Sequence, residues 1–120
     1  MSIVYIKRIS DIEEKIVDIE GAKDTTIQWL ITKENAGAKN FAMRRFVIKP
    51  GGKIPKHNHP WEHEIYILSG KGIVGAADKE YEVSKDMVLY IPPDIDHWYR
   101  NPFDESFIFL CIIPYKEKKN

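Results

Sequence analysis

The sequence predicts an all-β fold, arranged as a sandwich or a barrel. Segments rich in β-branched and aromatic residues recur at short intervals, and turn-forming residues separate them. The chain has 120 residues, the usual size of one domain, and its apolar fraction of 43% is that of an ordinary globular protein. Many short strands at such spacing are typical of sandwiches and barrels. We therefore expect a single domain over residues 1–120.

Eight segments have the composition of strands. In chain order they are residues 25–33, 40–50, 63–70, 72–77, 79–84, 87–93, 97–101 and 105–114. The turns expected between them lie at 35–40, 49–60, 69–72, 76–80 and 101–105. One helix is a further possibility near the N-terminus, where Ser10 and Glu13 have the spacing of a capping box. Residues 15–19 fit a strand equally well, so both alternatives stay open there.

Side-chain alternation predicts which residues of two strands share a face. One face of the strand at 63–70 carries His63, Ile65 and Ile67, and one face of the last strand carries Phe107, Phe109, Cys111 and Ile113. If these faces point inward, the candidates for lining a pocket are Ile65, Ile67, Phe109 and Cys111, with simple core packing as the alternative for each. Cys111 is either a soft ligand or redox target, or a buried inert thiol.

The last strand is apolar on both faces, because Ile108, Leu110 and Ile112 fill the face opposite Phe109. Such a strand is expected to be covered on both sides. A second sheet or a partner subunit would cover it, and a central place in a sandwich core explains it equally well.

Charge and cysteine content exclude several classes of function. Eighteen basic residues balance eighteen acidic ones, so no excess charge is available to neutralise phosphates, and we expect no nucleic-acid or membrane-surface partner. We also expect no secretory signal and no segment long enough to span a bilayer. Cys111 is the single cysteine, which excludes an intrachain disulfide and favours a reducing compartment. Together these observations predict a soluble cytoplasmic protein.

All four histidines fall in two short stretches, which is the strongest functional signal in the chain. His57, His59 and His63 lie within seven residues, and His97 follows in a distant segment. Imidazole is the most common protein ligand for transition metals, and the two-residue spacing of His57 and His59 puts both on one face of an extended strand. His63 and His97 can join them through tertiary pairing. The set predicts one metal site.

The same residues resemble the two motifs of the cupin superfamily. Gly51, five residues, His57–Asn58–His59, three residues, His63, six residues and Gly70 resemble the first motif, and Pro92, Asp94, His97 and Asn101 resemble the second. The resemblance implies a small jelly-roll barrel, also called a double-stranded β-helix, with the metal inside its mouth. It implies a barrel core over residues 38–115 and N-terminal strands over 1–35 that pack on the barrel or exchange with a partner, hence a homodimer.

Two departures from the motifs are informative. His63 stands where most metal-binding cupins carry a glutamate, and in this the chain resembles small bacterial cupins whose site is built from four histidines. That subgroup implies His57, His59, His63 and His97 as ligands and manganese as the metal; the ligands alone would also suit iron, nickel, copper, cobalt or zinc. Asp86 and Asp94 replace glycines of the second motif, which changes turn geometry without removing a ligand.

Four neutral imidazoles would leave a divalent ion its full charge, which favours anionic or chelating ligands. An ion that prefers six ligands would keep two positions open, for a bidentate substrate or for substrate and dioxygen together. The first prediction is therefore a manganese- or iron-dependent oxidoreductase of the dioxygenase type that acts on a small organic molecule. A non-catalytic cupin that binds or senses a small ligand or metal is the alternative, and a metal-assisted isomerase or lyase is the third. Protons should displace the metal on mild acidification.

Two further pairs of residues bear on the site. Arg44 and Arg45 are neighbours in a strand, so one of them is expected to face inward, where it would favour carboxylate binding. Trp61 and Trp98 border histidines and are expected to shape the mouth of the site or to seal an interface.

Overall fold

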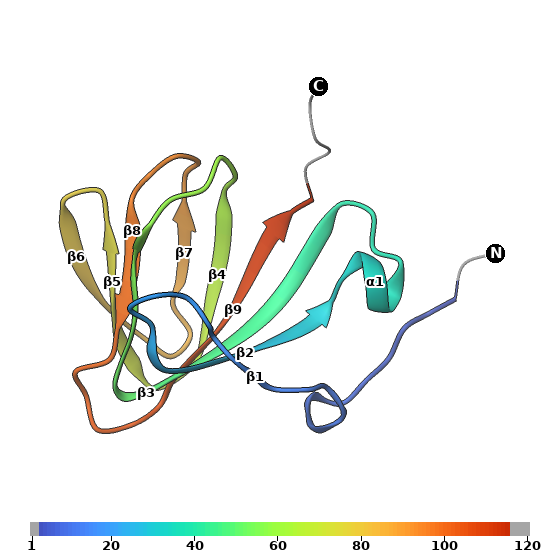
Figure 1. Cartoon of the computed structure of the whole chain (residues 1–120), viewed down its shortest axis with the longest axis horizontal. Coiled ribbons are helices and arrows are strands. Elements are labelled where there is room, and N and C mark those ends of the chain that lie inside the picture. The colour runs from blue at the N-terminus through green and yellow to red at the C-terminus, as the bar shows by residue number, and fades with distance from the viewer. Residues whose placement is uncertain (1–2, 116–120) are drawn as a thin grey trace.

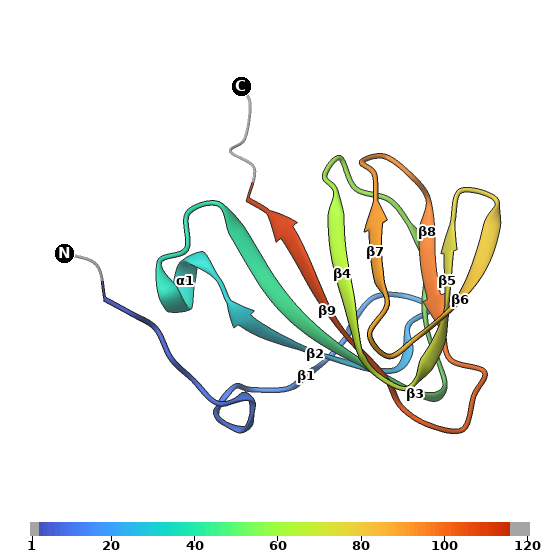
Figure 2. The same ribbon diagram turned by 180° about the vertical axis from the view of Figure 1, so that it is seen from behind.

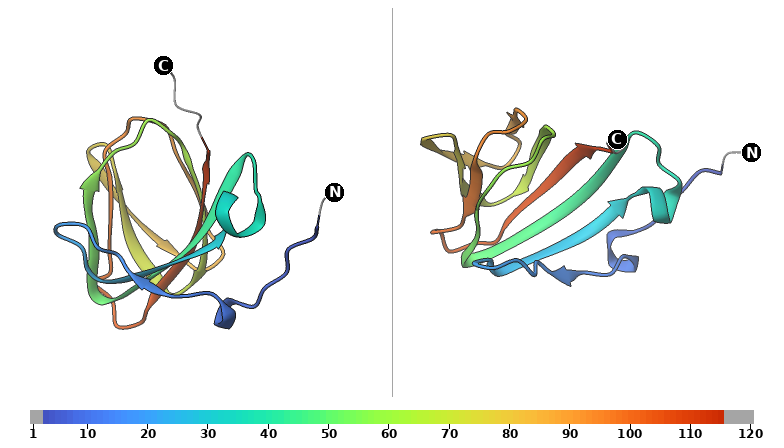
Figure 3. Two further views of the ribbon diagram at one scale, coloured as in Figure 1. Left: turned by 45° about the vertical axis from the view of Figure 1, so that its right-hand side comes forward. Right: turned by 45° about the horizontal axis from the view of Figure 1, so that its top comes forward.

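The computed structural model describes residues 3–115 and shows an antiparallel sheet that curls into a barrel (Figures 1 and 3). The strands are β1 (Lys15–Ile16), β2 (Lys23–Ile31), β3 (Phe41–His57), β4 (His63–Ser69), β5 (Lys71–Ala76), β6 (Lys79–Ser84), β7 (Val88–Ile91), β8 (His97–Arg100) and β9 (Phe107–Pro114). They are paired in the order β6-β5-β8-β3-β9-β4-β7, and β2 pairs with both β1 and β3. The all-β barrel predicted from the sequence is confirmed.

β3 joins the two halves of this sheet. Its first part pairs with β9 from Phe41 to Ile48, and its end pairs with β8 from Lys53 to His57. The turn predicted at 49–60 is therefore wrong, because the strand bends there and continues. Gly51 adopts a φ of +83° at the bend, and its N–H donates to the Asn101 carbonyl at 2.7 Å. The backbone at the bend is thus hydrogen-bonded to the segment that follows β8, and the strand continues.

The helical segments differ from the sequence prediction. Residues Ile9–Asp11 form a single 3-10 turn and β1 follows, so the alternative of a strand near residue 15 is the correct one. A short helix, α1 (Lys33–Ala36), begins instead where β2 ends: the Thr32 hydroxyl accepts from the Asn35 N–H at 3.1 Å, and Asn35 Oδ1 accepts from the Thr32 N–H at 2.7 Å. Among residues 3–115, no helix is long and apolar enough to cross a membrane.

The core lies between the two halves of the sheet, and aromatic rings fill its centre. Phe109 stacks on Phe46 at 5.2 Å and on Tyr99 at 5.1 Å between ring centroids. The predicted alternation is correct on β4 and β9, because the faces that carry Ile65 and Phe109 are buried. The opposite face of β9 is half-buried, and β9 lies between β3 and β4 as a central strand.

Both aspartates that replace motif glycines adopt left-handed backbone conformations. Asp86 has a φ of +70° and Asp94 a φ of +65°, a region in which aspartate is tolerated better than most residues. The Asp94 N–H donates to the His59 carbonyl at 2.7 Å, so this turn holds the backbone of the histidine segment.

Candidate metal centre

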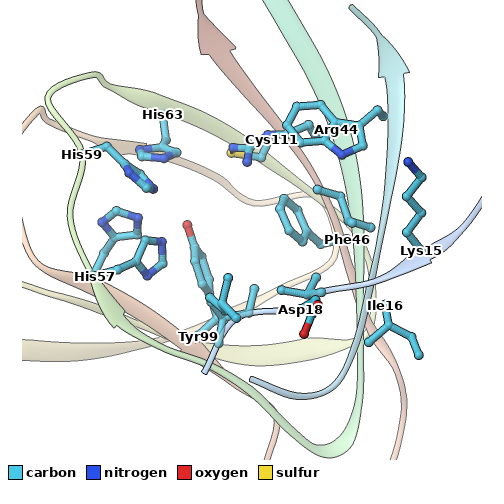
Figure 4. Close-up of a pocket in the computed structure, with 16 residues that line it drawn as sticks. Lys15, Ile16, Asp18, Arg44, Phe46, His57, His59, His63, Tyr99 and Cys111 are labelled. Carbon is cyan, nitrogen blue, oxygen red and sulfur yellow. The ribbon is translucent and has the colours of Figure 1, made fainter. Parts of the chain in front are cut away.

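A cavity of about 350 Å³ lies inside the barrel, with histidines at one end and apolar side chains along its walls (Figure 4). β3, β4 and β8 contribute His57, His63 and His97, the segment between β3 and β4 contributes His59, and β9 contributes Cys111. The segment from Lys15 to Ile19, which contains β1, supplies part of the remaining wall. The cavity is therefore enclosed by strands from both ends of the sequence.

Three of the predicted histidines converge on one point. His57 ends β3 and His97 begins β8, and the two are direct partners in the sheet, with ring centroids 4.2 Å apart. The His59 ring lies 4.8 Å from that of His57. Each of the three offers a ring nitrogen within 4.8 Å of the other two. These residues are placed to bind one metal ion.

His63 lies beside this group without belonging to it. It begins β4, and its ring centroid is 4.6 Å from that of His97 and 5.4 Å from that of His59. It lines the same cavity, and its side chain is buried. Its role as a fourth ligand stays a prediction.

Backbone carbonyls set which nitrogen of two histidines faces the cavity. His57 Nδ1 lies 2.8 Å from the Pro55 carbonyl, and His97 Nδ1 lies 2.9 Å from the Ile95 carbonyl. A carbonyl only accepts, so each Nδ1 carries the proton and each Nε2 keeps its lone pair. A second hydrogen bond of this kind is what orients metal-ligating histidines in known sites.

The buried nitrogens of the group fit a metal. Within residues 3–115, His97 Nε2 and His63 Nδ1 are both buried and have no hydrogen-bond partner. A buried polar atom left in this way costs on the order of 1–3 kcal/mol. A divalent ion bound by these nitrogens would remove that cost, so the donor set suits an imidazole-ligated transition metal.

Electrostatics keep the histidines in the neutral form that binds metals. Burial lowers the pKa of His59 to about 4, and His57, His97 and Arg44 add smaller effects in the same direction. Burial likewise lowers the pKa of His63 to about 3, with further contributions from His97 and Arg44. Burial also lowers the pKa of His97, against the effect of the Ile95 carbonyl. At neutral pH these three histidines are therefore uncharged and available as ligands.

Sequence reasoning placed Ile65, Ile67, Phe109 and Cys111 in the pocket, and the structure separates them. Cys111 lines the cavity, whereas the other three belong to the buried core cluster. All four face inward as alternation requires. Phe46 and Tyr99 stack over Phe109, however, and so form the cavity wall in its place.

The structure also decides between the two arginines. Arg44 lines the cavity and donates from Nη2 to Cys111 Sγ at 2.9 Å. Arg45 donates to Gln28 Oε1 at 2.9 Å and does not line the cavity. Neighbouring side chains on a strand point to opposite faces, so only one of the pair can enter.

The two tryptophans next to histidines differ in their surroundings. Trp61 stacks on His59 with ring centroids 4.4 Å apart and an interplanar angle of 5°, so it supports one side of the site. Trp98 instead donates from Nε1 to the exposed Glu80 carboxylate at 2.7 Å.

Sequence reasoning missed Tyr99 as a site residue. It lies two residues after His97 on the same face of β8, so strand alternation could have found it. Its hydroxyl points toward the histidines in Figure 4 and makes no hydrogen bond within residues 3–115. Burial raises the pKa of the Tyr99 phenol well above its ordinary value, so the group holds its proton at neutral pH.

The family follows from the match between residues 44–113 and the family described as Cupin domain. This chain belongs to the cupin family. The match covers the strands that carry the four histidines and the cavity residues Arg44 and Cys111. Among solved structures, this cupin is similar to the polyketide cyclase RemF from Streptomyces resistomycificus, with 31% identity and a TM-score of 0.89 over 95% of this chain and 81% of that one.

Further relatives carry different names. A predicted oxalate decarboxylase from Thermotoga maritima has a TM-score of 0.81 and 26% identity over 93% of this cupin and 100% of that chain. The curated Polyketide synthase CurC from Streptomyces cyaneus is 28% identical over 82% of this cupin. The alignments span 64% of the length of CurC and 57% of that of Protein SchB from Streptomyces halstedii. Similarity to proteins of such different names fixes the family and leaves the reaction open.

Proposed function

We propose that this cupin is a metal-dependent enzyme that acts on a small organic molecule through a divalent ion held by His57, His59, His63 and His97. The observation that carries the proposal is the convergence of three ring nitrogens within 4.8 Å, beside the buried, partnerless Nε2 of His97. When bound there, a divalent ion supplies Lewis acidity toward a carbonyl or hydroxyl oxygen of the substrate. Manganese or iron is the metal we propose, on the resemblance to four-histidine cupins.

The residues of the cavity provide the other requirements of catalysis. Phe46, Ile54 and the segment from Lys15 to Ile19 line its walls, and the apolar side chains among them exclude water from a bound substrate. Tyr99 holds a proton next to the histidines, where it can donate a hydrogen bond or a proton to a developing oxyanion. The histidines hold the ion and remain neutral.

The protonated Tyr99 favours a reaction without redox change, such as a cyclisation, isomerisation or lyase reaction of an enolisable carbonyl compound. Such reactions need an electrophile and a proton donor in one site; a bound ion would supply the first, and Tyr99 the second. Similarity to the polyketide cyclase RemF supports this reaction class. The sequence favoured an oxidoreductase because two open positions on the ion could hold substrate and dioxygen together.

An oxidoreductase of the dioxygenase type is the second candidate. The neutral nitrogen ligands favour it, because they leave the ion its full charge and leave room for more than one exogenous ligand. A binding or sensing cupin without turnover is the outcome if neither reaction is found.

The test is to purify the protein without chelators, measure bound metals, and incubate it with diketones, phenols and small carboxylates under air and under argon. Turnover under argon supports the non-redox reaction, and oxygen consumption that tracks with manganese or iron supports the oxidoreductase. A metal content that is unchanged in His57→Ala and His97→Ala variants would contradict the proposal. Metal binding without turnover in either atmosphere would leave the binding function.

We also propose that two copies of the chain form a homodimer. Ile3, Val4 and Ile6 are more than 80% exposed on an N-terminal segment that runs away from the barrel in every view (Figures 1 to 3). A groove on the outer face of β4, β7 and β9 carries the exposed side chains of Val88 and Tyr90. Burying both apolar surfaces against a second copy would remove them from water. A mass of about 14 kDa by light scattering would overturn this proposal.

A cytoplasmic location is part of the same proposal. Cys111 is buried and free, and the sequence has no second cysteine to pair with it. A reducing compartment keeps such a thiol intact. Fractionation that found the protein outside the cytoplasm would contradict it.

A further inference from the structure

Arg44 carries a positive charge into the cavity on the side away from the histidines, where Lys15 and Asp18 also line it. Arg44 comes from β3 and faces inward beside Trp29 and Phe46. Its guanidinium carbon lies 5.1 Å from the Phe46 ring centroid and 5.6 Å from that of Trp29. Aromatic faces attract a cation but accept none of its N–H groups in the way an oxygen does. The two rings therefore fix the side chain without satisfying its donors.

The hydrogen-bonding capacity of Arg44 is largely unused. Its one side-chain bond within residues 3–115 runs from Nη2 to Cys111 Sγ, a weak acceptor, and its Nε is buried with no partner. The ion pair found in that part of the chain joins Arg100 to Glu80 on the surface. Asp18 also lines the cavity, but it is exposed and forms no ion pair with Arg44. Arg44 as a whole is half-buried, but its Nε is buried, and a positive charge held there without a counter-ion is costly. An anion in the cavity would supply the partner that residues 3–115 do not.

The position of Arg44 relative to the histidines says where that anion would bind. In Figure 4, Cys111 lies between His63 and Arg44, so the arginine and the histidine cluster face the same cavity from either side of the thiol. A ligand held by Arg44 would therefore extend toward the ring nitrogens of the cluster. The walls between them include Phe46, which suits an unsaturated or aromatic body.

We infer that Arg44 is the specificity-determining residue of this site and that the ligand is a small carboxylate with an apolar, planar body. The guanidinium presents parallel N–H donors that match the two oxygens of a carboxylate. The cavity volume of about 350 Å³ is at the small end of ligand sites, which limits the body to roughly one or two rings. This inference rests on the proposed function, because it names the substrate class of the same site.

The experiment compares benzoate with benzamide, which has nearly the same shape but no charge. Both are titrated by calorimetry into the manganese-loaded protein and into the metal-free protein. We expect benzoate to bind at least tenfold more tightly than benzamide to both forms. Arg44→Gln removes the charge and should reduce this preference to threefold or less, and Arg44→Met should do the same if the glutamine variant does not fold.

Arg45→Gln is the matched control, because Arg45 is the next residue of the strand and lies outside the cavity. It should keep the full preference. Metal affinity provides an independent readout: removing a positive charge near the cluster should leave manganese binding by Arg44→Gln equal to that of the wild type or tighter. A structural role alone would instead weaken it.

Several results would overturn the inference. They are equal binding of benzoate and benzamide to the wild type, an unchanged preference in Arg44→Gln, or the same loss in Arg45→Gln. Weaker manganese binding by Arg44→Gln would assign Arg44 to holding the histidines in place, and would also overturn it. A wild type that binds no metal yet keeps an Arg44-dependent preference would refute the proposed function and leave the inference standing.

Discussion

Asn101→Asp replaces the amide NH2 group of a buried, hydrogen-bonded side chain of the second motif by an oxygen. Asn101 is 1% exposed, and its Nδ2 donates to the carbonyls of Ile48 at 2.8 Å and Glu105 at 2.7 Å. Its Oδ1 accepts from the Phe103 N–H at 2.9 Å. The side chain thereby ties the start of the bend in β3 to the loop that enters β9. Aspartate has the same shape but, when ionised, no donor.

The size of the effect follows from these bonds. The buried Ile48 carbonyl and the part-buried Glu105 carbonyl lose their donor, at about 1–3 kcal/mol each, and face a carboxylate instead. We expect the free energy of unfolding to fall by roughly 3–5 kcal/mol, or about 10–20 °C in melting temperature for a domain of this size. Acidification to pH 5 should recover part of the loss, because burial raises the pKa of such a carboxyl and the protonated form can donate one bond.

The assay is thermal unfolding of the metal-free protein, followed by circular dichroism at pH 7 and pH 5. Asn40→Asp is the control, because Asn40 is exposed and its side chain makes no hydrogen bond within residues 3–115. A melting temperature of the Asn101→Asp variant within about 3 °C of that control at pH 7 would refute the reasoning.

Four other predictions concern the metal and the barrel. Burial lowers the pKa values of His59 and His63 to about 4 and about 3, so protons should release the metal well below pH 6.5, and not on the mild acidification expected from the sequence. Dialysis and elemental analysis measure the loss, and half-loss at pH 6.5 or above would contradict it. The same lowered pKa values mean that, between about pH 6.5 and 4, His59 and His63 take up protons only in the unfolded chain. The free energy of unfolding of the metal-free protein should therefore fall as pH falls through this range, and chemical denaturation at several pH values measures it. His97→Ala should weaken metal binding by a hundredfold or more, and His63→Ala does likewise only if His63 is a ligand. Gly75→Ala should destabilise the barrel by at least about 2 kcal/mol, because its Cβ would lie 1.8 Å from the Trp98 ring, and an unchanged melting temperature would contradict this.

Strand alternation predicted the inward faces of the sheet well, because period two depends only on local geometry. Ile65 and Phe109 are buried as expected. Alternation does not tell where along a strand the core ends and the cavity begins. It therefore did not separate Cys111, which lines the cavity, from Phe109, which lies in the core. It could have identified Tyr99, two residues from His97, but it could not have shown that the rings of Phe46 and Tyr99 cover Phe109.

Tertiary pairing accounts for the rest of what the sequence left open. His57 pairs with His97 in the sheet because β3 continues through its bend. The local sequence, with Gly51 and Gly52, indicates a turn at that place instead. The wall supplied by residues 15–19 depends on β1 pairing with β2, and no motif in that segment signals a cavity. At position 86 the backbone is left-handed, the conformation that favours glycine, although the residue is aspartate.

The carbonyls that orient His57 and His97 belong to the main chain of Pro55 and Ile95. A replacement at either position changes a side chain but leaves the oxygen in place, so point mutations cannot easily abolish this orientation. The walls of the cavity, by contrast, are made by side chains, which substitutions change directly. Single substitutions in the walls can therefore change which ligand fits the cavity while the orientation of the two histidines is kept.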